Sequence, residues 1–211
     1  MTRLRLLYQK GAPIAFLSHL DLWRILSRLV RRAGLPMVYS LGFHPRPHIA
    51  MGPPLPVGAM GDQEQCDLYL EQMTPATLVE RLKGLGPPGL LIHSVREIPE
   101  HEKALTAFPF RSLWQLDGEW QKAPEADWFT NVLARESIPV HRHTPKREKT
   151  FDLRPYLLSF CSGIDWLQVE TVSYPSGGAR LDEILRLLKA DHYEFSLRSI
   201  CRKRLQFGPA I

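Results

Sequence analysis

Cysteine is scarce in this sequence, and no two cysteines have the spacing that builds a metal or redox centre. Only three of the 211 residues are cysteine, and none of them forms a CxxC pair. This disfavours a zinc ribbon or finger and leaves no three-cysteine motif for a radical iron–sulfur centre. Sparse, separated cysteines of odd number are typical of reduced thiols, so we expect a cytoplasmic protein.

Long apolar runs and nucleotide-binding glycine motifs are also missing. No apolar run approaches the roughly 18 residues that a membrane-spanning helix needs. The charged N-terminal stretch is more typical of a strand than of a signal peptide. Neither GxxxxGKS/T nor GxGxxG occurs, which disfavours phosphate-loop and dinucleotide-binding folds. We therefore expect no cofactor and no membrane partner.

Basic residues are concentrated at the start of the chain. The formal net charge is +5, yet residues 1–50 contain eight Lys or Arg and one acid, which gives +7. The other 161 residues contain 19 bases and 21 acids, which gives −2. Such an asymmetry points to a polyanionic partner for the first quarter of the chain.

Hydrophobic spacing and cap signals predict an α+β first half. We expect, in order, strand 3–9, helix 18–33, strand 37–41, strand 66–70, helix 74–83 and strand 90–98. The first helix is the best defined, because Ser18 is a good N-cap and Gly34 follows its last turn. Six prolines fall between Pro36 and Pro56, so residues 42–61 should form a long loop or a distorted hairpin.

The second half repeats this order more loosely. We expect strand 110–116, helix 124–136, strand 138–143, strand 165–174, helix 181–188 and strand 193–199, with residues 149–162 as an inserted piece. In both halves the order strand–helix–strand–strand–helix–strand is that of a split βαβ unit. The predicted fold is therefore two tandem ferredoxin-like (βαββαβ) lobes, residues 1–103 and 104–211.

The first predicted helix carries a one-sided stripe of arginines. Arg24, Arg28 and Arg31 follow one another at i, i+4 and i+7, and Arg32 lies beside them. Like charges at this spacing repel one another, and no acid follows Asp21 in the helix to compensate. An ordinary solvated face and a ridge that contacts phosphates both agree with this pattern. Phosphate contacts of this kind supply affinity rather than sequence choice.

The loop after the helix displays further polar groups. His44, Arg46 and His48 alternate with prolines that hold the backbone extended. A stiff loop of this kind suits anion or RNA binding, and a structural loop is the alternative. Two histidines without a third ligand at a diagnostic spacing do not make a metal site, so we expect no metal. Phe43 is either a stacking platform for a base or part of the core.

Two histidines are candidate catalytic residues. His19 lies at a helix N-terminus, where the macrodipole disfavours its cation and keeps the ring neutral, as a general base must be. Local packing or capping is the alternative role. His48 is the second candidate base. In a metal-independent ribonuclease, Lys10 or Arg46 would stabilise the charge that develops during cleavage.

A second basic cluster lies in residues 141–149, before an Asp–Arg pair in the DLRP segment that is more typical of structure than of catalysis. Basic clusters from both halves could line one nucleic-acid groove. The candidate nucleic-acid-binding residues are Lys10, Arg24, Arg28, Arg31, Arg32, Phe43, Arg46, Arg142, Lys146 and Arg147.

Several strings of the chain together resemble one protein family. They are FLSHLDLWR (16–24), RRAGLP (31–36), YSLGFHPRPHIAMGPPLPVG (39–58) and KTFDLRPYL (149–157). The family is the uncharacterised domain found fused to, or encoded beside, radical SAM proteins with a B12-binding-type domain. Its motif falls here on Ser18, His19, Asp21, Ser40, Gly42, Phe43, Pro45, Asp152, Arg154 and Pro155. Family members usually have Asn at the position of His44.

This resemblance implies an accessory domain without iron–sulfur or cobalamin ligands of its own. Together with the basic first quarter, it predicts a non-catalytic module that binds RNA, or presents a polyanionic substrate to a radical SAM partner. One alternative is a metal-independent endoribonuclease, since tandem ferredoxin-like lobes are similar to those of CRISPR-repeat-processing enzymes. The other alternative is a protein-interaction domain only.

Overall fold

The chain divides into two compact units. The computed structural model describes residues 1–41, 43–99, 101–144 and 147–208, with the backbone alone for 143–144 and 147–148. The first unit is Met1–Phe108 together with Arg202–Leu205, and the second is Pro109–Cys201 together with the residues from Gln206 onward. The sequence predicts a division near residue 103 but gives no sign that residues of the last strand belong to the first unit.

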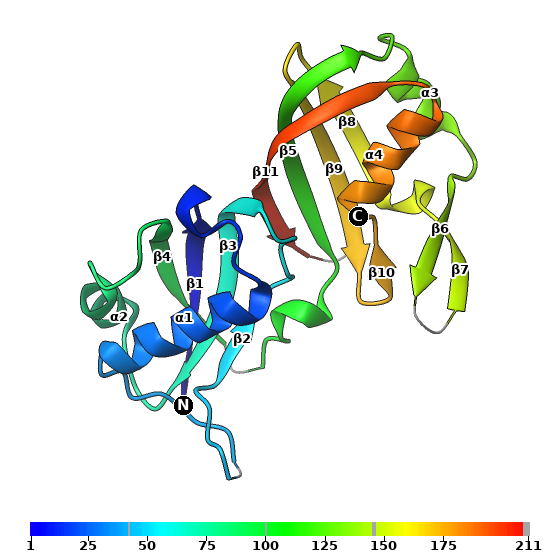
Figure 1. Cartoon of the computed structure of the whole chain (residues 1–211). Helices are drawn as coiled ribbons and strands as arrows, with labels where there is room; N and C mark the ends of the chain where they lie inside the picture. The colour runs from blue at the N-terminus through cyan, green and yellow to red at the C-terminus, as the bar shows by residue number, and fades with distance from the viewer. Residues whose placement is uncertain (42, 100, 145–146, 209–211) are drawn as a thin grey trace. The chain divides into compact units, whose positions relative to one another are not determined.

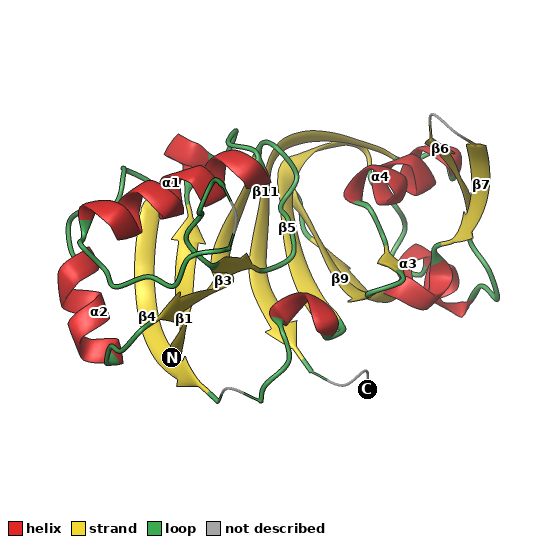
Figure 2. Ribbon diagram, turned by 90° about the horizontal axis from the view of Figure 1, so that it is seen from below, coloured by secondary structure: helices red, strands yellow, loops and turns green. Residues whose placement is uncertain are grey.

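The first unit is an antiparallel sheet with two helices on one face. Its elements are β1 (Thr2–Lys10), the 3-10 turn η1 (Ala12–Ile14), α1 (His19–Arg32), β2 (Ile49–Met51), β3 (Ala59–Leu70), α2 (Pro75–Leu82), β4 (Leu90–Ile98) and the 3-10 turn η2 (Leu105–Ala107) (Figure 1). The strand order is β3-β1-β4, and both β2 and β11 (Glu194–Phe207) pair with β3. Figure 2 shows α1 and α2 on the same face of these strands, where their leucines pack against those of β1 and β3.

Local signals explain α1, and the prediction of this helix is confirmed. The hydroxyl of Ser18 accepts a hydrogen bond from the backbone N–H of Asp21 at 3.1 Å and donates one to its carboxylate at 2.6 Å. Leu22, Leu26 and Leu29 recur on the buried face. The helix ends before Gly34, which adopts a φ of +61°, a conformation that glycine reaches without steric cost.

The predicted strand 37–41 is wrong. That segment contributes only isolated bridges, and the strand that pairs with β3 at this edge is β2, which lies in the expected loop. The described residues of the segment 38–48 form a distorted hairpin instead, in which the N–H of His48 donates to the carbonyl of Val38 at 2.8 Å. The physical reason is proline: Pro45 and Pro47 have no N–H to donate, so a regular ladder cannot continue.

The second unit is a second antiparallel sheet with its own helices. Its elements are β5 (Phe110–Lys122), α3 (Trp128–Ala134), β6 (Pro139–Thr144), β7 (Arg147–Asp152), the 3-10 turn η3 (Arg154–Tyr156), β8 (Leu157–Ser162), β9 (Trp166–Tyr174), β10 (Gly177–Gly178), α4 (Leu181–Ala190) and the first part of β11. The strand order is β9-β5-β11, with β8 and β10 also paired to β9. The indole of Trp128 in α3 packs edge-on against Phe160 of β8 and Tyr193.

The assignment of strand 138–143 to this sheet is wrong. β6 pairs with β7 alone and forms a separate two-stranded ribbon. The strand beside β9 is β8, which comes from the segment predicted to be an insertion. The reason is visible in the side chains: β6 is basic and polar, whereas β8 begins with the buried Leu157. Only β8 can extend the buried face of the sheet at the edge of β9.

Candidate nucleic-acid interface

Four of the predicted arginines surround one surface hollow of the first unit. The hollow has a volume of about 350 Å³ and is lined by Leu20, Trp23, Arg24, Ser27, Arg28, Arg31 and Arg46. The α1 residues among them lie three and four positions apart, so they share one face of the helix. Arg46 reaches the same hollow from the 38–48 hairpin. We call this site the arginine hollow.

Acidic side chains neutralise little of the charge around the arginine hollow. Arg24 pairs with Asp21, with 2.8 Å between Nη1 and Oδ1. Hydrogen bonds from Ser18 and then Arg24 lower the pKa of the Asp21 carboxyl, so this acid stays ionised. The side chains of Arg28, Arg31 and Arg46 are exposed, and among the described residues none of them has a hydrogen-bond or ion-pair partner.

Arg32 lies beside a neighbouring hollow rather than in the arginine hollow. It lines a more apolar depression of about 220 Å³ together with Ile25, Arg28, Leu29, Leu85 and Pro87. Arg28 therefore contributes to both depressions. The arginine stripe predicted on the first helix is present on the surface. Its arginines line two adjacent hollows rather than one.

The 38–48 hairpin explains several positions of the family motif. The hydroxyl of Ser40 accepts a hydrogen bond from the N–H of Arg46 at 3.1 Å, and the two backbones also pair, which closes the hairpin. Phe43 and Leu41 near its end are fully exposed, so the alternative of Phe43 as a core residue is wrong. Pro45 is exposed too. Gly42, the remaining motif position here, lies outside the described residues.

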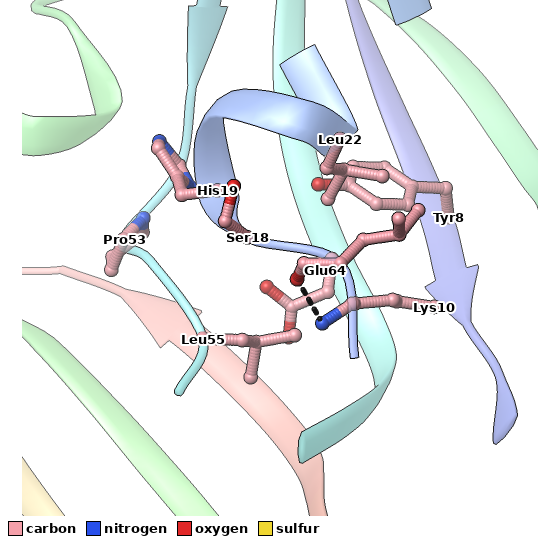
Figure 3. A pocket seen from close by; sticks show the side chains of 9 residues that line it. Tyr8, Lys10, Ser18, His19, Leu22, Pro53, Leu55 and Glu64 are labelled. Atoms are coloured by element: carbon pink, nitrogen blue, oxygen red, sulfur yellow. Dashed lines mark hydrogen bonds between the residues drawn. The ribbon is translucent and has the colours of Figure 1, made fainter. Parts of the chain in front are cut away.

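Lys10 is buried, and its prediction as a nucleic-acid contact is wrong. Its side chain extends under the start of α1 (Figure 3). The ammonium donates to the carbonyl oxygens of Ala15 at 2.6 Å, Leu17 at 3.0 Å and Ala59 at 3.1 Å. An ammonium has three N–H donors, so all of them are used. Burial lowers the pKa of Lys10, and no donor remains for an external phosphate.

His19 lines a small pocket with Lys10, Tyr8 and Glu64 (Figure 3). The pocket has a volume of about 10 Å³, which is roughly the space of one water molecule. Burial, and then the positive charges of Arg202 and Lys10, lower the pKa of the His19 imidazole. The ring is therefore neutral near pH 7. Because the donors of Lys10 are all used, this pocket has no ammonium that could stabilise a developing negative charge.

His48 lies on the other face of the sheet. It stacks on Tyr69 with ring centroids 3.8 Å apart and an interplanar angle of 6°. His48 precedes Ile49, which is in register with Leu68, so His48 shares the face of Tyr69. His19, by contrast, lies beside Glu64 on the α1 face. The two candidate bases do not form one site.

Arg142 of the second unit, predicted as a nucleic-acid contact, is engaged in hydrogen bonds within the fold. Its Nε donates to the buried Glu183 at 2.6 Å, and its Nη2 donates to the carbonyl of Gly178 at 2.7 Å. Its guanidinium also lies 3.4 Å above the ring centroid of Phe151. Lys146 lies outside the described residues, and for Arg147 only the backbone position at the start of β7 is described.

The DLRP segment builds a turn. The Asp152 carboxylate accepts hydrogen bonds from the backbone N–H groups of Ile138 at 2.8 Å and Arg154 at 3.0 Å, and the first of these lowers its pKa most. Arg154 in turn donates to the carbonyls of Leu133 and Leu157. Pro155 lies inside η3. The hydrogen bonds of Arg154 therefore link α3 to the start of β8.

A network of buried charges in the first unit was not predicted from the sequence. Asp67 accepts hydrogen bonds from Arg3 at 2.9 Å and from Arg5 at 2.6 Å, and Arg5 also pairs with Glu102. Arg3 and Arg5 alternate in β1, so they face the same way, and this spacing is the signal that could have paired them. Their partner acids come from distant positions of the chain.

The second buried pair joins the last strand to the first unit. Arg202 binds Glu64 through both carboxylate oxygens, one at 2.8 Å, and also donates to the carbonyl of Pro53. Among the described residues no three His, Cys, Asp or Glu side chains gather to hold a metal ion. No helix in the described part of the chain has both the length and the apolar character of a membrane span.

A family model matches residues 3–192, so the chain belongs to the family described as "Uncharacterized protein conserved in bacteria (DUF2344)". A search of curated proteins gave no match. One similar solved structure is described as "Crystal Structure of a Cbf5-Nop10-Gar1 Complex". That similarity has a TM-score of 0.49 and 11% sequence identity, and it covers 97% of this chain and 48% of that one.

Proposed function

We propose that this member of the family is a non-catalytic RNA-binding module whose phosphate contacts come from the arginine hollow. The single observation that carries the proposal is the meeting of Arg28, Arg31 and Arg46 around one hollow with no acid paired to them among the described residues. The planar guanidinium group of arginine is suited to bidentate binding of phosphate. Lys10 and Arg142 take no part, because the fold already uses their charges.

The fold belongs to the same proposal. We propose two ferredoxin-like lobes, in which β8 rather than β6 is the second strand of the C-terminal lobe. The support is the strand order, which is β4-β1-β3-β2 in the first unit and β11-β5-β9-β8 in the second. When β6, β7 and β10 are left aside, each of these orders places the fourth, first, third and second strand of the unit side by side. The resemblance of the motif strings supports a radical SAM protein as the partner to which the bound polyanion is presented.

A salt titration tests the RNA proposal. A labelled 20-nucleotide RNA should bind at low salt, and its affinity should fall steeply as salt rises. In an Arg28→Glu/Arg31→Glu variant the affinity should drop and the slope of log affinity against log salt should become shallower by about one to two.

The matched control changes the same charge elsewhere on the first unit. Arg96 is exposed and in register with Arg5, so it lies on the sheet face away from α1, and Lys103 is exposed beyond β4. An Arg96→Glu/Lys103→Glu variant should keep most of the affinity. No detectable binding to the wild-type protein at low salt, or an equal loss in both variants, would refute the arginine hollow as an RNA site.

A further inference from the structure

We infer that the arginine hollow takes an unpaired nucleotide of single-stranded RNA, with the base against Trp23 and the flanking phosphates on the arginines. The inference rests on the proposed RNA-binding function and names the form of RNA that the hollow takes. It comes from the uncharged residues that line the hollow rather than from its charge.

The uncharged residues that line the hollow include a leucine and a tryptophan. Leu20, Trp23 and Ser27 lie on the same face of α1 and line the hollow together with the four arginines. Leu20 is half exposed, although an isolated solvated helix face would normally carry a polar residue there. The indole of Trp23 packs partly against the hydrophobic core, which holds it in place, while the rest of it lines the hollow.

A hollow lined by one tryptophan and four arginines matches the two parts of a nucleotide, the base and the phosphate. Proteins that bind single strands combine a positive groove for the backbone with aromatic rings on which bases stack. The hollow, at about 350 Å³, is at the lower end of the range of small-ligand sites, about 300–1,000 Å³. That size suits one nucleotide better than a longer stretch of strand.

A duplex would use this surface less well. In a paired helix the bases are stacked inside, so a duplex could reach the arginines with its phosphates but could offer no base to Trp23. The structure therefore predicts a preference for single strands that depends on Trp23. The salt dependence, by contrast, depends on the arginines.

Binding of one labelled 12-nucleotide RNA, alone and annealed to its complement, tests the inference by fluorescence anisotropy at a fixed salt concentration. We expect the single strand to bind about tenfold more tightly than the duplex. Trp23→Leu should lower the affinity for the single strand about tenfold, leave the duplex affinity within about twofold, and leave the salt slope unchanged. Trp23→Phe should retain most of the affinity, because phenylalanine keeps an aromatic face.

Tryptophan emission gives a second readout that does not depend on the stability of the leucine variant. The sequence has five tryptophans, and stacking on one of them should quench part of the emission when unlabelled single strand is added. The Trp23→Phe variant should bind without that quench. A quench of equal size in Trp23→Phe would place the stacked base elsewhere and overturn the inference.

The remaining outcomes separate the two proposals. Equal affinity for strand and duplex, unchanged by Trp23→Leu, would refute base stacking at Trp23 while RNA binding through the arginines stands. Failure to bind either RNA would refute both proposals. Tighter binding of a glutamate-rich peptide with one phenylalanine than of either RNA would make the hollow a protein-docking surface and overturn the inference.

Discussion

Arg3 and Arg5 of the sheet both bind Asp67, whereas Arg28 and Arg31 lie on the surface of α1 with no described acid paired to them. The two groups have the same side chain and come from the same basic stretch of sequence. Of its eight bases, Arg3, Arg5 and Lys10 are buried, and five are exposed. The local charge of +7 therefore overstates the charge available to a partner. Burial decides which arginines support the fold and which can bind a ligand.

The largest effect should follow from removing the carboxylate that the buried arginines share. Asp67→Asn leaves two guanidinium groups in the sheet without their common counter-charge, and we expect a loss of about 3–5 kcal/mol in the free energy of unfolding. Urea unfolding followed by circular dichroism measures it. The surface variant Arg28→Glu/Arg31→Glu should change the same quantity by no more than about 0.5 kcal/mol. Similar losses in the two variants would remove the distinction between the two groups.

A smaller loss should follow from replacing the buried lysine. Lys10→Met keeps much of the apolar length of the side chain but leaves three carbonyl oxygens without their donor. We expect a loss of about 2 kcal/mol in the free energy of unfolding, against about 0.5 kcal/mol or less for the exposed Lys103→Met. RNA affinity of the folded Lys10→Met protein should equal that of the wild type. A loss of RNA affinity in the folded Lys10→Met protein would show that Lys10 contributes to RNA binding.

The smallest effect concerns pH. The pKa of His19 in the folded chain lies below its ordinary value of 6.5, because of burial and the nearby Arg202 and Lys10, with Glu64 acting in the opposite direction. Below pH 6.5 the unfolded chain therefore takes up a proton more readily than the folded chain. The free energy of unfolding should decrease as the pH is lowered through this range. Urea midpoints at pH 7.5 and 5.0 should differ less in His19→Gln than in the wild type. The exposed His141→Gln should keep the wild-type difference, and a reduction there as well would contradict this role of His19.

The helix α1 and its arginine stripe could be predicted from the sequence because both are local features. The cap at Ser18, the leucine spacing and the stripe of Arg24, Arg28 and Arg31 all lie within one helix, where period and neighbourhood determine position. Arg46 was predicted as an anion contact from its stiff loop. Arg46 lies next to α1 because Ser40 closes the hairpin that carries it. Neither helical nor strand periodicity in the sequence predicts that hairpin.

What could not be predicted depends on contacts between distant parts of the chain. Arg3, Arg5 and Lys10 count as surface charge until their acceptors are known, and those acceptors lie up to 100 positions away. Strand choice in the second unit failed for a related reason. Residues 138–143 and β8 both have strand character, and only the competition for the edge of β9 decides between them.

The ion pair of Arg202 with Glu64 also determines when the first unit can be completed. The two residues are 138 positions apart, so closing this contact requires nearly the whole intervening chain to be present. A ribosome would expose β1, α1 and β3 long before it delivers Arg202, and until then Glu64 would lack its counter-charge. Domains usually fold in their order of synthesis. Here the first unit includes Arg202–Leu205 of β11, so we expect a fragment that ends near Phe108 to be less stable than the first unit of the whole chain.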